Sequence, residues 1–305
     1  MSDRIIADRN RKAELAEQSP APAPAHESIA EELDLVSVGM ALRDFCLDQV
    51  LHVDVALSRH AHPHRGVHEA RKGIRRLRSA LALGAPGFGG YVAKIDRALQ
   101  QLGRSLSSLR DAHVAVELAR RRAKRATDPA LRATWRYAAA ALVRARTEVL
   151  HRELSDDAEF AGRRAALARC ARKVMRLAWR SLDTSTLSAQ LAYSRKRADR
   201  AAARIDDDVS LAQLHRVRRR LRRHRMQVSA LTALLDPQAS PPVHAAAGFR
   251  ASVAAYASTF EELSARVDTL GARLDRSLLR DALRELPRGH ERKAALAALR
   301  DDGAS

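Results

Sequence analysis

Two segments of the chain carry histidine and arginine at matching positions, and these residue types suit the binding of phosphate groups. Residues 67–81 read VHEARKGIRRLRSAL, and residues 214–228 read LHRVRRRLRRHRMQV. Arginine offers a planar fork of donors that fits phosphate oxygens, and its charge does not titrate near neutral pH. The pattern predicts a repeated cationic element with a large anionic partner. The matching pairs are His68 with His215, Arg71 with Arg218, Lys72 with Arg219, Arg75 with Arg222, Arg76 with Arg223 and Arg78 with Arg225.

Both segments have the period of an amphipathic α-helix. Residues three, four and seven apart share a helical face, so the histidine and cations of each segment gather on one side. The opposite side carries Ala70, Ile74, Leu77 and Leu81 in the first segment and Val217, Leu221, Val228 and Leu231 in the second. Like charges four residues apart destabilise a helix by a few tenths of a kcal/mol per pair. We therefore expect two anion-binding ridges, with an ordinary solvated face as the alternative. The first ridge is His68, Arg71, Lys72, Arg75, Arg76 and Arg78; the second ridge is His215, Arg218, Arg219, Arg222, Arg223 and Arg225.

Composition predicts a mostly helical protein with a strongly positive surface. Of the 305 residues 46% are hydrophobic but only 4% are aromatic, and only 13 are glycine. Lysine and arginine number 55 against 36 aspartates and glutamates, which gives a net charge of +19. A field of this sign attracts polyanions, namely nucleic acid, anionic membrane surfaces or polymeric phosphate.

The sequence also gives expectations about membrane insertion, secretion and disulfide bonds. It has no stretch of about 20 apolar residues, so we expect no membrane span. The N-terminus lacks the apolar core of a secretion signal, so we expect a cytoplasmic protein. Two cysteines, Cys46 and Cys170, are too few for a disulfide framework, and we expect buried, reduced thiols.

The chain is expected to begin with a disordered tail and linker over residues 1–27, which end in the Pro/Ala-rich segment SPAPAPAH. Turn signals separate the helical segments, above all GAPGFGG at 84–90 and DPQASPP at 236–242. Periodicity predicts helices over residues 28–58, 64–83, 89–126, 128–155, 158–182, 184–205, 210–236, 242–269 and 272–286, with a further one at 290–300.

A second pair of motifs extends the repeat. Residues 106–111 (LSSLRD) align with residues 270–275 (LGARLD), each in a helix that follows a basic segment. An internal duplication predicts an all-α fold of two four-helix bundles related by a pseudo-two-fold axis, with halves at 28–157 and 158–300. The two ridges would then face each other across a central basic groove.

Three motifs resemble those of the CHAD family, named for histidines set in an α-helical domain. They are V-H-x-x-R-K-x-x-R-R-L-R at 67–78, L-x-x-L-R-D-A-H-V at 106–114 and L-H-x-x-R-R-x-L-R-R at 214–223. The resemblance covers roughly residues 28–300, and it implies binding of inorganic polyphosphate and association with polyphosphate granules. Two positions depart from the pattern. Ser107 stands where the family usually has glycine, and Leu274 precedes Asp275 where the first half has Arg110.

Asp111 and Asp275 fit two roles. As metal ligands or general bases they would indicate a phosphohydrolase, but such sites usually gather several carboxylates at ligand spacing, which the sequence lacks. We therefore expect Asp111 and Asp275, with Arg110, to support and orient the ridge arginines.

Other polar residues give weaker signals. The pattern His60-x-His62-x-His64 resembles a metal site, but a loop of exposed histidines is favoured, and no metal is expected. Cations at helical spacing extend the groove or form an ordinary solvated face; they are Lys94, Arg97, Arg104, Lys196 and Arg200.

These observations favour a non-catalytic binder of inorganic polyphosphate that requires no cofactor. Nucleic acid, contacted without sequence specificity, is the alternative partner, disfavoured because few aromatic residues are available to stack bases. A metal-dependent phosphohydrolase is the third hypothesis. His68 and His215 lie among cations that favour the neutral imidazole, whereas a bound phosphate favours protonation. We therefore expect affinity to rise as the pH falls toward about 6.

Overall fold

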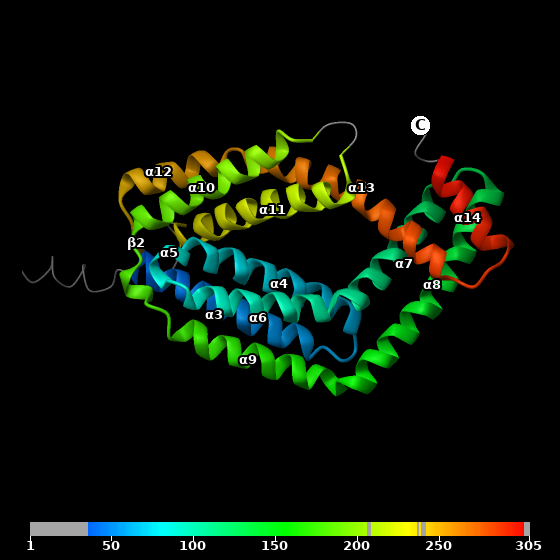
Figure 1. Ribbon diagram of the computed structural model, residues 1–305, viewed down its shortest axis with the longest axis horizontal. Coiled ribbons are helices and arrows are strands. Elements are labelled where there is room, and N and C mark those ends of the chain that lie inside the picture. The colour runs from blue at the N-terminus through cyan, green and yellow to red at the C-terminus, as the bar shows by residue number, and fades with distance from the viewer. Residues whose placement is uncertain (1–35, 206–208, 237, 239–241, 302–305) are drawn as a thin grey trace, which may run out of the picture. The chain divides into compact units, whose positions relative to one another are not determined.

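The protein is built almost entirely of helices (Figure 1), as composition predicted. The computed structural model describes residues 36–205, 209–236, 238 and 242–301, so the predicted tail at 1–27 lies outside the described residues. In chain order the α-helices are α3 (Val38–Leu57), α4 (Pro63–Leu83), α5 (Ala85–Phe88), α6 (Tyr91–Ser105), α7 (Ser107–Arg125), α8 (Pro129–Asp156), α9 (Ala161–Met175), α10 (Thr184–Ala202), α11 (Leu211–Leu234), α12 (Ala247–Ala257), α13 (Phe260–Glu285) and α14 (His290–Asp301). Two 3₁₀ turns, η1 (Ala158–Phe160) and η2 (Trp179–Ser181), and two short strands, β1 (Val36–Ser37) and β2 (Val243–His244), complete the described chain.

The two strands correct the predicted helices at 28–58 and 242–269. β1 pairs in parallel with β2, and the backbone nitrogen of Val36 donates to the carbonyl of Pro242 at 3.1 Å. α3 therefore starts only at Val38, where the Ser37 hydroxyl accepts from the nitrogen of Met40 and caps the helix. Residues 28–35 lie outside the described residues. A pairing of only two residues in each strand is too short to produce a recognisable period in the sequence. The neighbouring helical periodicity therefore predicted helix at both strands.

Other boundaries also differ from the prediction. The helix expected at 89–126 is divided at Leu106 into α6 and α7, and the helix expected at 242–269 is divided after Ala257 into α12 and α13. The helix expected at 158–182 ends at Met175 and is followed by η2, whereas α13 continues through Gly271, where a break was expected. Glycine is unfavourable inside a helix by about 1 kcal/mol but does not end one, so tertiary packing decided these positions.

The buried residues form three hydrophobic clusters. The largest joins α3, α4, α6 and α9 with parts of α11 and α12; another joins α7, α8, α14 and the end of α13; the third joins α10, α11 and α13. Residues from Val36 onward form one compact unit, and α9 packs against α3 and α6 of the predicted first half. The internal duplication and the halves 28–157 and 158–300 therefore stay predictions.

The apolar faces predicted for the two basic segments are confirmed. Ala70, Ile74, Leu77 and Leu81 are buried on α4, and the four matching apolar residues of α11 are buried too. α4 and α11 pack against each other, α7 packs against α4 and α13, and α13 packs against α11. These four helices position the charged residues described below.

Two further sequence expectations concern cysteine and membrane helices. Cys46 and Cys170 are both buried and unpaired, as expected. None of the described helices combines the length and the apolar character needed to cross a membrane.

Candidate anion-binding cleft

The packing of α4 against α11 places the two ridges face to face. Burial, together with the charges of Arg71, Arg110, Arg218 and Arg225, lowers the pKa of Arg75 to about 10. The two ridges therefore face each other, as the sequence predicted. Positive charge is concentrated there because arginines from both helices approach one another.

Arg222, on the opposite wall, is in the same situation. Burial and the charges of Arg218, Arg75 and Arg225 lower its pKa to about 9, against an opposing effect of Asp275. Among the described residues, neither Arg75 nor Arg222 has a side-chain hydrogen-bond or ion-pair partner, and the Nε atom of Arg75 is buried without one. Two desolvated cations without counter-ions form a strong, preformed anion site.

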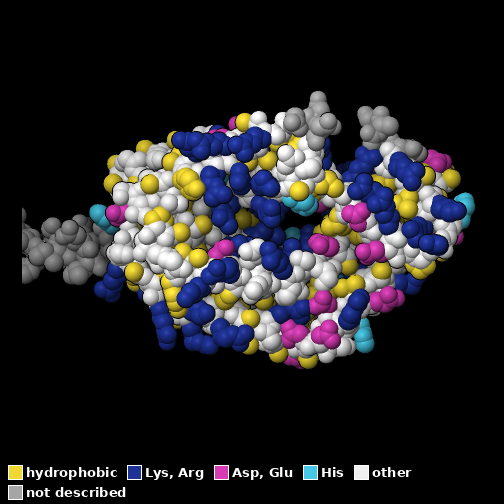
Figure 2. All heavy atoms as spheres, viewed as in Figure 1, with side chains coloured by type: hydrophobic (Ala, Val, Ile, Leu, Met, Phe, Trp, Pro, Cys, Tyr) yellow, Lys and Arg dark blue, Asp and Glu magenta, His cyan; other side chains and the backbone are white. Residues whose placement is uncertain are grey.

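A cleft of about 820 Å³ opens between α4, α6, α10 and α11. Figure 2 shows dark-blue side chains gathered in the hollow between α11 and α4. Among the described residues that line it, ten are arginines and none is aspartate or glutamate. Its volume lies in the usual range of ligand pockets.

The cleft contains half of the predicted ridge residues. Those that line it are Arg71, Arg75, Arg78, Arg219, Arg222 and Arg223. The others, which flank it without lining it, are His68, Lys72, Arg76, His215, Arg218 and Arg225. Of the predicted groove extension only Arg104 lines the cleft; Lys94, Arg97, Lys196 and Arg200 are exposed outside it.

Three lining arginines escaped the sequence analysis, namely Arg197, Arg216 and Arg220. Arg216 and Arg220 lie four residues apart on α11 and form a row with two arginines of the second ridge, a spacing that the sequence does contain. Arg197 comes from α10, and its guanidinium lies 5.5 Å from the ring centroid of Tyr193, four residues earlier. Only the packing of α10 on α11 brings Arg197 into the cleft.

Arg71 and Arg218 are anchored in equivalent ways on the two sides. Arg71 donates from Nη1 to the carbonyl of Gly103 at 2.6 Å and to the hydroxyl of Ser107 at 2.8 Å. Arg218 donates from Nε to the carbonyl of Val267 at 3.3 Å. Gly103 precedes Ser107 by four residues, as Val267 precedes Gly271, so the contacts occupy matching positions of the repeat. This correspondence supports the predicted duplication.

The same anchoring gives a role to the serine that departs from the family pattern. At Gly271 an added Cβ would lie 2.5 Å from Nη2 of Arg218, so glycine leaves space for that guanidinium. At Ser107 the side chain is instead accommodated, and its hydroxyl accepts a hydrogen bond from Arg71.

Asp111 and Asp275 act on the ridge arginines from a distance. Burial raises the pKa of Asp111, while the charges of Arg71 and Arg110 oppose this rise. Burial lowers the pKa of Arg218, and the charge of Asp275 opposes that shift. Among the described residues neither carboxylate forms an ion pair within 4.0 Å, so the direct pairs that the sequence predicted are replaced by longer-range attraction. Burial and the charge of Arg71 lower the pKa of Arg110, whereas the charges of Asp275 and Asp111 both raise it.

Other ridge residues have direct partners. Arg78 binds Asp96 of α6 through two hydrogen bonds of 2.8 and 2.9 Å, and Arg225 donates to the hydroxyl of Ser264 at 3.2 Å. Asp96 neutralises the charge of Arg78, whereas the hydroxyl of Ser264 occupies one donor of Arg225 and leaves its charge.

Both ridge histidines are held neutral. Burial and the charge of Arg110 lower the pKa of His68, with a partly opposing effect of Glu69. Burial and the charge of Arg219 lower the pKa of His215, with Asp111 opposing. The neutral imidazoles expected near neutral pH follow from these surroundings.

The expected loop of exposed histidines holds for His60 and His62, whereas His64 lies in the first turn of α4 and is half-buried. His64 stacks on His113 of α7 with ring centroids 5.3 Å apart, and Nη1 of Arg146 lies 3.4 Å from Nδ1 of His113. The described part of the chain contains no group of three or more histidine, cysteine, aspartate or glutamate side chains placed to hold a metal ion.

Comparison with known proteins agrees with this fold. The chain is similar to the crystal structure of the CHAD domain from the plant Ricinus communis, at 20% identity over 88% of this chain and 87% of that one, with a TM-score of 0.63. It is also similar to PptA from Streptomyces chartreusis, at 18% identity over 88% of this chain and 94% of that one, with a TM-score of 0.60. No curated protein matches this chain. The family model described as the CHAD domain matches residues 41–284, most of the chain, and the chain therefore belongs to the CHAD family.

Proposed function

We propose that the protein binds inorganic polyphosphate in the cleft between α4 and α11 and does not cleave it. The observation that carries this proposal is the pair Arg75 and Arg222, which are desolvated and have no ion-pair partner within 4.0 Å among the described residues. A phosphate chain supplies the missing negative charge at both guanidinium groups, each of which can donate two parallel hydrogen bonds to it.

The lining favours a bare phosphate polymer over nucleic acid. Tyr193 is the one aromatic side chain among the described residues that line the cleft, and the guanidinium of Arg197 lies over its ring. Proteins that hold single strands use successive aromatic side chains, each worth about 1–3 kcal/mol per stacked base. A cleft of ten arginines and one partly covered ring gives bases little to stack on.

The environment of the two aspartates supports binding without catalysis. Asp111 and Asp275 lie among arginines, and a divalent metal beside them would face the positive charges of Arg71, Arg110 and Arg218. Phosphoryl-transfer sites normally hold their metal with several converging carboxylates. Polyphosphate binding in the cytoplasm, with recruitment to polyphosphate granules, is the cellular role that we propose.

Competition tests the proposed ligand. Long-chain polyphosphate should displace a labelled DNA single strand from the protein at a charge concentration at least about tenfold lower than the unlabelled strand requires, because the cleft offers bases little to stack on. Equal displacement per unit charge would contradict polyphosphate specificity. Chain shortening during incubation with a divalent metal would contradict the non-catalytic role.

We predict that polyphosphate affinity increases as the pH falls from about 8 to about 6. The pKa values of His68 and His215 are lowered in the unliganded protein, and a bound polyanion raises them again. Binding therefore takes up protons, and affinity gains about threefold to tenfold as the pH falls through the pKa values of the complex. Calorimetry in buffers of different ionisation enthalpy measures this uptake.

The matched control for the pH effect is the variant His68→Gln/His215→Gln. It should bind with an affinity that is nearly independent of pH over the same interval. A pH dependence that persists unchanged in this variant would assign the effect to groups other than these two histidines.

A further inference from the structure

A second group of cations lies outside the cleft, on the outer surface of two helices that pack together, α6 and α9. Figure 2 shows dark-blue side chains at its lower left, where these helices lie. These cations are exposed, and among the described residues they have neither a hydrogen-bond nor an ion-pair partner. We name this surface the α6–α9 face; its residues are Lys94, Arg97, Arg169, Arg172, Lys173 and Arg176.

Arg104 joins this face to the cleft. It is exposed on α6 and also lines the cleft. Arg97 precedes Arg104 by seven residues, so it lies on the same side of α6 about 10 Å away. Lys94 lies almost one turn further along α6. A linear anion that leaves the cleft over Arg104 therefore meets Arg97 and Lys94 next.

A groove between α6 and α9 brings the cations of α9 to the same place. It has a volume of about 600 Å³ and is lined by Ala98 and Gln101 of α6 and by Arg169 and Lys173 of α9. Lys94 precedes Ala98 by four residues and Gln101 by seven, so it lies on the same side of α6, next to the groove that Arg169 and Lys173 line. The positive track thus continues from α6 onto α9.

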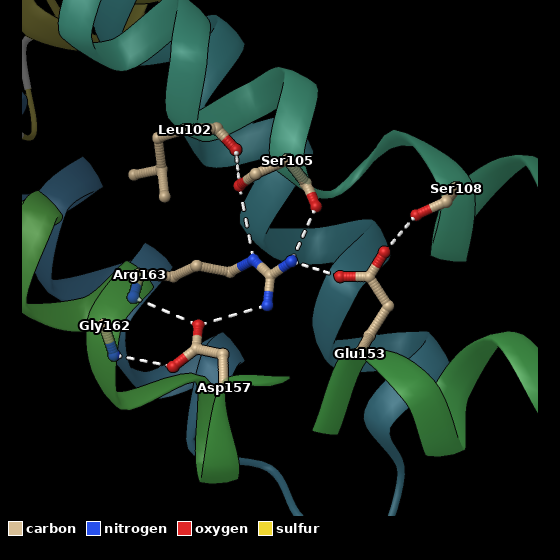
Figure 3. A network of polar contacts seen from close by, with 7 residues as sticks. All are labelled: Leu102, Ser105, Ser108, Glu153, Asp157, Gly162 and Arg163. Carbon is tan, nitrogen blue, oxygen red and sulfur yellow. Dashed lines mark hydrogen bonds and ion pairs between the residues drawn. The ribbon is translucent and has the colours of Figure 1, made fainter. Parts of the chain in front are cut away.

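Three carboxylates line the other end of this groove, and Arg163 pairs with two of them, Glu153 and Asp157 (Figure 3). The third, Asp156, is exposed and has no ion-pair partner among the described residues. Arg163 binds Glu153, donates from Nη1 to Asp157 at 3.1 Å and donates from Nη2 to the carbonyl of Ser105 at 2.9 Å. The hydroxyl of Ser108 donates to Glu153 at 2.6 Å, so this carboxylate has a second partner. The network connects the start of α9 to the end of α6. The basic part of the groove lies at its other end, near Lys173.

We propose that a long polyphosphate chain bound in the cleft continues over Arg104 onto the α6–α9 face, and that the protein thereby selects long chains over short ones. This inference rests on the proposed function of the cleft. A short phosphate fills the cleft alone, whereas a long chain also engages the face. Since the second contact is then intramolecular, it increases affinity without further loss of translational freedom.

The test compares tripolyphosphate with long-chain polyphosphate on two variants of equal charge. The face variant removes four cations of the α6–α9 face: Lys94→Gln, Arg97→Gln, Arg169→Gln and Lys173→Gln. The control variant removes four exposed cations of α7 and α8 that line neither cleft nor groove: Lys124→Gln, Arg136→Gln, Arg144→Gln and Arg152→Gln.

Tripolyphosphate affinity should be unchanged in both variants, because the cleft is intact. Long-chain affinity should fall about tenfold in the face variant and less than about threefold in the control. The slope of log affinity against log salt for long chains should decrease in magnitude by about 3 in the face variant, since four phosphate contacts are lost.

Three outcomes would overturn the inference. Equal losses in both variants would show that only net charge matters, and an equal loss for tripolyphosphate in the face variant would show that the cleft itself was disturbed. Failure of the unaltered protein to bind either phosphate would overturn the proposed function as well. That last result appears without any variant, so the two failures are distinguishable.

Discussion

The double variant Arg75→Glu/Arg222→Glu is expected to lose polyphosphate affinity by about a hundredfold or more. Each arginine removed takes away charge-assisted hydrogen bonds worth about 1.5–3 kcal/mol, and each glutamate adds repulsion of the ligand. Calorimetry or a polyphosphate competition assay at fixed salt measures the loss.

The variant should still fold, because each new carboxylate lies among arginines that it can pair with. Arg71, Arg110, Arg218 and Arg225 all act on the charge at position 75. Helical circular dichroism should therefore match that of the unaltered protein. The control is Arg136→Glu/Arg144→Glu on the exposed side of α8, which changes the net charge equally. If the control lost affinity to the same degree, the cleft would not be the binding site.

The second large effect concerns stability, which we expect to rise when the same two arginines become apolar. Arg75→Met/Arg222→Met removes two desolvated like charges, so the unliganded variant should be more stable by about 1 kcal/mol or more, while polyphosphate binding is lost. For a protein of this size, each kcal/mol corresponds to a rise of about 2–4 °C in Tm. Thermal unfolding with and without polyphosphate measures both effects.

The surroundings of Arg222 give the electrostatic reason for this prediction. Burial and the charges of Arg218, Arg75 and Arg225 together lower its pKa to about 9, so its charged form is disfavoured in the folded protein. The guanidinium nevertheless stays charged at neutral pH, and the methionine variant avoids this cost.

Ligand binding provides the internal check on stability. Polyphosphate at a hundred times its Kd should stabilise the unaltered protein by about 2.7 kcal/mol and should leave the methionine variant unchanged. A variant that is less stable than the unaltered protein without ligand would contradict the view that Arg75 and Arg222 lack counter-ions.

Local periodicity was sufficient to predict the helical class and the faces of α4 and α11. The buried positions Ile74, Leu77 and Leu221 follow directly from a repeat of 3.6 residues, since each helix must bury one stripe. The strand pairing of Val36 with Val243 could not be predicted, because its two members are joined only by the packing of distant segments. The division between α6 and α7 at Leu106 could not be predicted either, because no proline or glycine stands at that position.

The residues of the candidate site were also only partly predictable from the sequence. The sequence by itself determined which residues form the two ridges, because their spacing on each helix is a local property. Only the tertiary structure decided which of those charges remain available. Arg78 is engaged by Asp96 of α6, whereas Arg75 and Arg222 meet across the α4–α11 packing without an acidic partner among the described residues. The physical reason is that desolvation and charge neutralisation depend on neighbours distant in the sequence, and no helical period encodes which neighbours those are.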